Sequence, residues 1–150
     1  RALRLILGHD EKLAAWAARH IPNVGDAGFG PCRTIGIASG DRLYAVAVYH
    51  NYIPRYGVCE LSFAAVTPRW ATRETLRTVL GIPFDQYGCR KIYVTIEISN
   101  ERALKCIQGF GFSKEATLRH HFGHKRHAVV LSMMAHEYRG KWGPVLKEAA

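Results

Sequence analysis

The residues best placed to do chemistry lie at a corner between a strand and a helix, at positions 66–73. Thr72 is positioned to cap a helix that starts at Arg73. The free N–H groups and the positive dipole end of a helix start suit a pyrophosphate. Arg69 and Arg73 would add two cations there, and Thr72 a hydroxyl. An ordinary helix start with surface arginines remains the open alternative.

A single carboxylate, Glu60, lies in the otherwise apolar strand that leads into this corner. A carboxylate in such surroundings suits a general base that takes a proton from a substrate ammonium, directly or through water. A solvated or ion-paired strand glutamate is the alternative. His50 is a second candidate base, with an ordinary loop histidine as its alternative.

The elements that must position these residues follow from the spacing of apolar and turn-forming residues. Alternation and β-branched runs predict strands over 1–7, 33–38, 42–49, 58–66, 92–98, 112–121 and 128–134. Helical spacing predicts a first helix that is capped by Asp10 and ended by Pro22. It also predicts helices over 73–87 and 101–108, and Pro83 should kink or shorten the helix over 73–87. Residues 50–56 are expected to form a loop broken by Pro54, and residues from 136 onward a polar extension with an isolated Trp142.

Composition narrows the class of protein. The 150 residues are 48% apolar, which suits one globular domain, and no apolar run approaches the length of a membrane span. The net charge of +9 favours an anionic partner such as a phosphate-bearing cofactor, a nucleic acid or an acidic protein surface. Four single cysteines without a CxxC pair are typical of reduced thiols in a cytoplasmic protein. Because the first residue is Arg, the natural N-terminus is expected to lie upstream.

The stretch from Arg90 to Phe112, RKIYVTIEISNERALKCIQGFGF, carries a more specific pattern. A strand is followed by Asn100, then Ala103 in a short helix, then Gly111-Phe112. This linked pattern resembles the second half of the GNAT N-acetyltransferase fold, and with the order of the other elements the resemblance covers about residues 1–135. The segment Ser113–Arg119 is similar to the ribosomal-protein-acetylating branch of that family.

The resemblance implies a mixed α/β fold: a central, mostly antiparallel, splayed sheet flanked by helices, over residues 1–135, with 136–150 as a C-terminal extension. It implies acetyl-CoA as the cofactor and direct transfer of the acetyl group to a primary amine. The acceptor would be a protein N-terminus, a lysine or a small molecule. No membrane partner is expected.

The resemblance also implies roles for single residues. The pantetheine arm would lie between the strands that bear Glu60 and Glu97, with Glu60 as the base. The residues expected to bind the cofactor are Ala65 and Val66 through their backbone, the corner residues Arg69, Trp70, Ala71, Thr72 and Arg73, and Asn100 and Ala103.

Two family features are missing. The glycines that the family usually carries at the pyrophosphate loop are absent from VTPRWATRETL, although the lead-in Val66-Thr67-Pro68 is present. The tyrosine that often serves as general acid falls on Ile107, so no general acid is assigned, and nothing selects among Tyr49, Tyr52 and Tyr56.

Other readings of the sequence are weaker. The run RHHFGHKRH at 119–127 is rich in histidine but lacks the regular ligand spacing of a structural zinc site, so no metal is expected. Together with HNYIPRY at 50–56, it mixes basic and aromatic residues as single-strand nucleic-acid binders do, although no RNA-binding consensus is present. The rival hypothesis is therefore a catalytically weak GNAT-like binding module in a basic or nucleic-acid-associated assembly.

Overall fold

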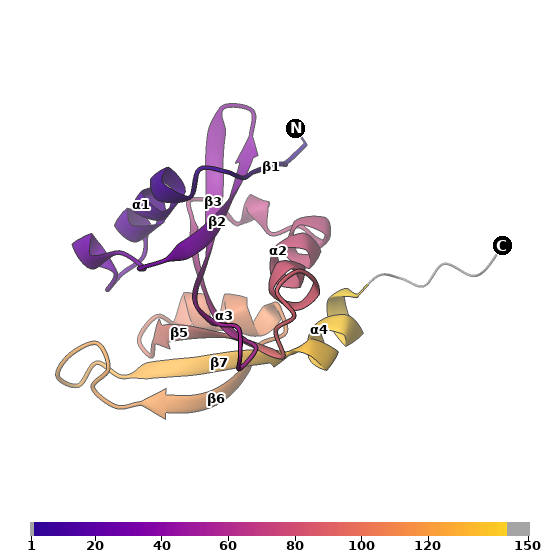
Figure 1. Ribbon diagram of the computed structural model, residues 1–150. Coiled ribbons are helices and arrows are strands. Elements are labelled where there is room, and N and C mark those ends of the chain that lie inside the picture. Colours follow the sequence, from indigo (N-terminus) through magenta and orange to yellow (C-terminus); the bar gives the residue numbers. More distant parts are fainter. Residues whose placement is uncertain (1, 144–150) are drawn as a thin grey trace.

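The computed structural model describes residues 2–143, which form one seven-stranded sheet with helices on both faces (Figure 1). Among these residues, no helix has the length and apolar character needed to cross a membrane. The elements in chain order are β1 (Arg4–Ile6), α1 (Asp10–His20), the 3-10 turn η1 (Gly25–Ala27), β2 (Cys32–Ser39), β3 (Arg42–Ile53), β4 (Val58–Ala65), the 3-10 turn η2 (Pro68–Trp70), α2 (Arg73–Asp85), β5 (Lys91–Glu97), α3 (Glu101–Gly109), β6 (Ser113–Leu118), β7 (Ala128–Met134) and α4 (Ala135–Trp142).

The strands are ordered β1-β2-β3-β4-β5-β7-β6. Every neighbouring pair is antiparallel except β4 and β5, which run parallel. Helix α1 covers one face of the β2–β4 part of the sheet, and α2, α3 and α4 pack on the other face (Figure 1). The predicted fold class, a mostly antiparallel mixed α/β sheet flanked by helices, is confirmed.

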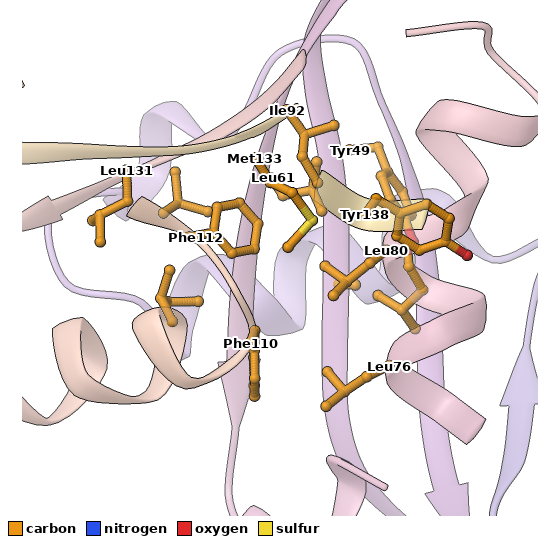
Figure 2. Packing of buried hydrophobic residues seen from close by; sticks show 14 of the residues in the cluster. Tyr49, Leu61, Leu76, Leu80, Ile92, Phe110, Phe112, Leu131, Met133 and Tyr138 are labelled. Carbon is orange, nitrogen blue, oxygen red and sulfur yellow. The ribbon is translucent and has the colours of Figure 1, made fainter. Parts of the chain in front are cut away.

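Alternation along β4 divides the core in two, as the sequence pattern predicts. Cys59 and Leu61 join the larger cluster with α2, α3 and α4, whereas Ala64 packs against α1. Figure 2 shows the larger cluster, in which Leu61 from β4 meets Ile92 from β5 and Met133 from β7. This cluster joins the two halves of the sheet at the point where β4 and β5 still pair.

The start of α1 differs from the sequence expectation. Asp10 is the first helical residue and not the cap, and the preceding His9 makes no capping hydrogen bond through its side chain. The Asp10 carboxylate instead accepts hydrogen bonds from the backbone N–H and the hydroxyl of Thr34, both at 2.8 Å. This aspartate therefore joins α1 to β2, a tertiary role that helix-start rules do not detect.

Strand β3 continues through Ile53, so the prediction of a loop over 50–56 is wrong for its first half. A register shift between His50 and Ile53, with Asn51 at a φ of 47°, absorbs the irregularity, and only the residues from Pro54 to Gly57 form the turn. As a result His50 is a buried sheet residue and not a loop residue.

The polar C-terminal region begins with α4, and its aromatic residues are part of the core. Tyr138 and Trp142 are buried, and the indole N–H of Trp142 donates to the carbonyl of Phe110 at 2.7 Å. Tyr138 stacks on Phe84 of α2. The expectation of an isolated Trp142 is wrong, because the helical spacing of two aromatics in a short polar segment places both against α2 and α3. Residues 144–150 of the expected extension lie outside the described residues.

Candidate functional site

Strands β4 and β5 pair only at their first three residues. The pairs are Val58 with Lys91, Cys59 with Ile92, and Glu60 with Tyr93. Beyond them, β4 stays paired with β3 as far as Ala65, and β5 stays paired with β7 as far as Glu97. The two facing edges are thus without a sheet partner past Glu60 and Tyr93, and their backbone N–H and C=O groups are free to bind something else.

A cavity of about 680 Å³ occupies the region where the two strands part. Its volume falls within the range of cofactor and small-molecule sites. Five regions of the chain form its wall: the end of β4 with the corner that follows, the end of β5, α3, the segment after α1, and the β6–β7 loop through Phe122. The sheet thus opens into a pocket that both of its faces help to line.

The corner between β4 and α2 is rigid although it has no glycine. The Thr67 hydroxyl accepts from the backbone N–H of Arg69 at 3.3 Å, and the Thr72 hydroxyl accepts from that of Thr75 at 3.2 Å. Between these two caps, Trp70 is only 4% exposed and stacks on Phe63 with ring centroids 5.7 Å apart. Threonine caps and a buried indole therefore fix the corner.

The structure brings half of the sequence-selected residues to the cavity wall. Those that line the cavity are Ala65, Val66, Trp70, Asn100 and Ala103. Those that do not are Glu60, Arg69, Ala71, Thr72 and Arg73. Asn100 accepts the backbone N–H of Ala103 at 3.2 Å and so caps α3. The Arg73 guanidinium is directed to α4, where it donates to the Lys141 carbonyl at 3.1 Å.

Glu60 lies just behind the point where the strands part. Its carboxylate accepts from the amide of Asn51 at 2.9 Å, and its neighbours in the sheet are His50 and Tyr93. Burial, together with the charge of Glu60 and a hydrogen bond to it, raises the pKa of Tyr93 to about 12. Glu60 can reach the cavity only through a water or a side-chain movement.

A second polar pair lies nearer to the cavity. The Nε2 atom of His50 is 2.8 Å from the hydroxyl of Ser62, and Ser62 lines the cavity. His50 is 7% exposed, with Phe29 packed edge-on against its ring at 5.1 Å. Burial lowers the pKa of His50, and the charge of Glu60 partly opposes that shift. A neutral imidazole thus contacts the cavity through one hydroxyl.

The tyrosines considered as general acids lie elsewhere. Tyr49 is buried and donates to the carbonyl of Val79, while Tyr52 donates to the carbonyl of Tyr87 at 2.9 Å. Tyr56 is 55% exposed, and none of the three lines the cavity. Ile107 does line it, so an apolar side chain occupies the position at which the resemblance noted in the sequence would place a tyrosine.

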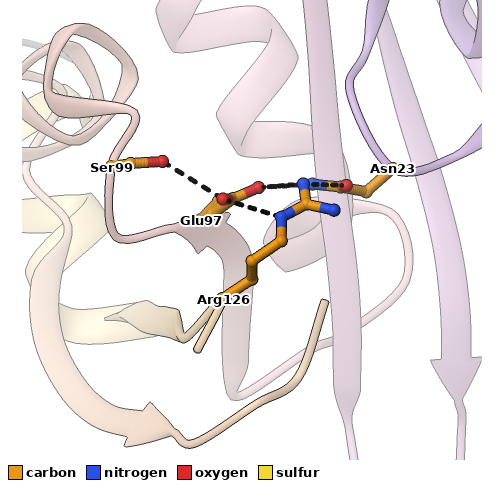
Figure 3. Close-up of polar contacts among 4 residues, drawn as sticks. All are labelled: Asn23, Glu97, Ser99 and Arg126. Carbon is orange, nitrogen blue, oxygen red and sulfur yellow. Dashed lines mark hydrogen bonds and ion pairs between the residues drawn. The ribbon is translucent and has the colours of Figure 1, made fainter. Parts of the chain in front are cut away.

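A polar network that the sequence did not reveal lies at the far wall of the cavity (Figure 3). Asn23, Glu97 and Ser99 line the cavity, whereas their partner Arg126 does not. Glu97 at the end of β5 accepts from Arg126 Nη2 at 2.6 Å and from Arg126 Nε at 3.1 Å. Asn23, from the segment after α1, donates to Glu97 at 3.1 Å and accepts from Arg126 at 2.7 Å. Ser99 donates to the second Glu97 oxygen at 3.2 Å. We call Asn23, Glu97, Ser99 and Arg126 the clasp.

The clasp joins three segments that are distant in sequence: the α1–β2 connection, the end of β5, and the β6–β7 loop. Hydrogen bonds from Arg126 and Asn23 lower the pKa of Glu97 to about 2. The carboxylate therefore remains ionised in neutral solution, with both oxygens occupied. A glutamate at the end of a strand was the only available signal for this site, because its partners lie 74 and 29 residues away.

The histidine-rich segment forms an ordered loop. His120 Nδ1 accepts the backbone N–H of Lys125 at 2.8 Å, and His127 Nδ1 accepts that of His120 at 2.9 Å. In residues 2–143, no group of three or more His, Cys, Asp or Glu side chains is arranged to hold a metal ion. These histidines shape the loop that carries Phe122 and Arg126.

Comparisons with known proteins relate this architecture to acetyltransferases. A solved structure to which acetyltransferase activity has been ascribed is 20% identical, with a TM-score of 0.73 over 95% of this chain and 88% of its own. Mutant forms of the spermidine/spermine N-acetyltransferase SpeG from Vibrio cholerae are 13% identical, with a TM-score of 0.73 over 93% of this chain and 98% of theirs. A further SpeG mutant from Vibrio cholerae is 14% identical, with a TM-score of 0.71 over 91% of this chain and 95% of its own. No protein-family model and no curated protein sequence matches the chain. At these identities the comparisons show the fold, which is GNAT-like.

Proposed function

We propose that this protein is an acetyl-CoA-dependent N-acetyltransferase that moves an acetyl group to a primary amine. The observation that carries the proposal is the parting of β4 and β5 after Glu60 and Tyr93, with a cavity of about 680 Å³ in the gap. A pantetheine arm has amide groups that can replace the missing strand partner, so the free edge of β4 fits this cofactor. The SpeG structures with the same fold act on spermidine or spermine, which are also amines.

The corner would hold the phosphates. The start of α2 after Thr72 offers free N–H groups and the positive end of a helix dipole, and Arg69 is exposed beside it. Ala65 and Val66, together with Trp70, would contact the arm, and Asn100 and Ala103 would contact it from α3. Ala71 and Thr72 would act by shaping the corner, since neither lines the cavity.

The bound thioester supplies the acetyl carbonyl that the acceptor nitrogen attacks; the C–S bond breaks, and the CoA sulfur leaves as a thiolate that takes up, through water, the proton lost by the new amide nitrogen. The protein must first take a proton from the acceptor ammonium. Glu60 is the base expected from the sequence, through a water. The His50–Ser62 pair is the alternative, since the Ser62 hydroxyl can take that proton while passing its own to His50 Nε2.

Two variants separate these bases. Replacement of Glu60 by Gln is expected to lower kcat by about a hundredfold and leave cofactor affinity nearly unchanged, because one general base contributes roughly that factor. Ser62→Ala, which breaks only the alternative route, should then change kcat by less than about threefold. The reverse pattern would assign the base to His50. The measurement is CoA thiol release against pH for both variants.

The acceptor class includes a protein N-terminus, a lysine and a small amine. The likeness of Ser113–Arg119 to the ribosomal-protein-acetylating branch favours a protein amine. The cysteine pattern favours a cytoplasmic protein. Both statements rest on the sequence.

Calorimetric titration with acetyl-CoA tests the function against the rival binding module. Saturable binding with micromolar affinity, followed by CoA release on addition of an amine, supports the enzyme. Absence of binding at about millimolar cofactor, the upper end of the usual range of KM values, would overturn it. Desulfo-CoA is the matched ligand control, because it keeps the phosphates and pantetheine arm but cannot transfer an acetyl group.

A further inference from the structure

The inference concerns the acceptor and rests on the proposed function. If the cofactor approaches from the corner at Val66–Thr72, the acceptor must reach the thioester along the remaining wall. That wall consists of the segment after α1, the end of β5 and Phe122 of the β6–β7 loop. The clasp joins these three parts, so its charge decides which amines are attracted.

This wall has no free negative charge. Among the described residues that line the cavity, Glu97 is the one carboxylate. Its side chain is 17% exposed, and Arg126 forms a two-point ion pair with it, the shorter contact being 2.6 Å. To pair with Glu97, an acceptor with several ammonium groups would have to displace a guanidinium held by two hydrogen bonds to Glu97 and one to Asn23, which is unfavourable.

The surroundings add positive charge. The loop 119–127 contains Arg119, Lys125 and Arg126, four histidines and no acidic residue. Arg126 does not itself line the cavity, but it is bonded to the cavity-lining Glu97, and its side chain is 48% exposed although the clasp fixes its position. Arg102 also lines the cavity. A fixed, half-exposed guanidinium on a basic loop is suited to bind carboxylates.

We propose that the acceptor is an anionic amine, an α-amino group with one or more carboxylates close by, and that the Glu97–Arg126 pair sets this preference. The pair neutralises Glu97, the one carboxylate among the described residues of this wall, and leaves the basic loop to recognise the acceptor. A free acidic amino acid and a peptide with an acidic N-terminal region share this chemistry. Polyamines lack it.

The test is a matched panel of acceptors at saturating acetyl-CoA, read as kcat/KM from CoA release. Three peptides differ only at their second and third residues, which are acidic, neutral or basic; glutamate and spermidine complete the panel. The acidic peptide is expected to exceed the basic one by about tenfold or more, as for complementary charges at a binding surface. Comparison of glutamate with the acidic peptide tells a free amino acid from a peptide acceptor.

Two substitutions should move this preference in opposite directions. Arg126→Gln frees Glu97 and is expected to lower the acidic-to-basic ratio by about tenfold, while Glu97→Gln frees Arg126 and should raise it. Arg139→Gln, an exposed position on α4, removes the same charge as Arg126→Gln and should leave the ratio unchanged. Opposite signs in two variants cannot arise from a general loss of folding.

The outcomes separate this inference from the proposed function. Turnover with a flat acceptor profile, or a preference for spermidine, overturns the acceptor class and leaves the acetyltransferase intact. If the acidic-to-basic ratio of kcat/KM is the same in the wild type, Arg126→Gln and Glu97→Gln, the proposed role of Glu97 and Arg126 is overturned. Lack of acetyl-CoA binding overturns both.

Discussion

The two ends of the cavity are held together by different interactions. At the corner end, Trp70 is buried between Phe63 and Phe110, and threonine caps fix the backbone. At the other end, loops are joined by the charged clasp around Glu97. Apolar packing is nearly independent of pH and salt, whereas an exposed ion pair depends on both. The stability of the corner end, where the cofactor would bind, is therefore expected to change little with pH and salt. The stability of the clasp end, where the acceptor would enter, is expected to depend on both.

The largest effect is expected from Trp70→Ala at the corner. Truncation of a buried aromatic residue costs about 3–5 kcal/mol of unfolding free energy, and the corner would lose the ring that supports it. Denaturant unfolding measures this loss. Trp70→Phe keeps a ring against Phe63 and should recover more than half of it. A cost below about 1 kcal/mol for the alanine variant would show that packing does not hold this end.

The next effect concerns the cations at the corner. Arg69→Ala is expected to weaken acetyl-CoA binding by about threefold to tenfold, the range of one charge-assisted contact near a surface. Arg77→Ala, an exposed position further along α2, is the matched control. Arg73→Ala is less specific because Arg73 also stacks on Trp142 at 5.3 Å and bonds α4. If neither Arg69→Ala nor Arg73→Ala changed the affinity for acetyl-CoA, the cofactor phosphates would have to bind elsewhere.

A smaller effect is expected from removal of the helix cap. Thr72→Ala should lower the unfolding free energy by about 1 kcal/mol, since the backbone N–H of Thr75 loses its acceptor. Thr78→Ala in the same helix removes only a hydroxyl bonded to the preceding turn and should cost less. Both are measured by denaturant unfolding. Equal costs for the two variants would mean that the hydroxyl of Thr72 does not stabilise the corner.

The smallest effect should appear at the clasp, as a dependence on pH. The pKa of Glu97 is lowered to about 2 by its hydrogen bonds with Arg126 and Asn23. Its stabilising contribution is thus complete above the ordinary carboxyl pKa of about 4.5 and is lost as the pH falls towards 2. The Tm difference between the wild type and Glu97→Gln should be constant above pH 5 and shrink below pH 4.5.

Glu11→Gln, an exposed position on α1, controls for general charge effects in that measurement. Added salt should reduce the Tm difference between the wild type and Glu97→Gln at neutral pH. The loss of unfolding free energy in Trp70→Ala should not depend on salt in this way. A difference that stays constant down to pH 2 would contradict the ion pair, since the Glu97 carboxyl would then have the same pKa in the folded and unfolded states.

Much of the fold could be predicted from local patterns. Residues 58–65 and 91–97 form strands and residues 101–109 a helix, all within two residues of the expected bounds, because alternation and helix caps act over a few residues. The errors at 50–53 and at α4 share one cause. His50, Tyr138 and Trp142 look like surface residues in sequence, but contacts with distant segments bury them.

The site was predicted less completely. The corner and the gap between β4 and β5 were expected, but only Ala65, Val66, Trp70, Asn100 and Ala103 of the selected residues line the cavity. Ser62 and the clasp were missed. Their significance depends on which residue of another segment lies within hydrogen-bonding distance, and no spacing rule contains that information.

The sequence by itself determined most of the strands and helices, apart from the end of β3 and helix α4, and showed that one strand, one helix start and Asn100 belong to a linked pattern. These features follow from backbone preferences and from side chains a few residues apart. Only the tertiary structure decided that β4 and β5 stop pairing after Glu60 and Tyr93, and that Asn23, Glu97 and Arg126 meet at the far wall of the gap. Both features depend on packing between segments far apart in the chain, because the core as a whole sets where two strands separate and which charged side chains meet.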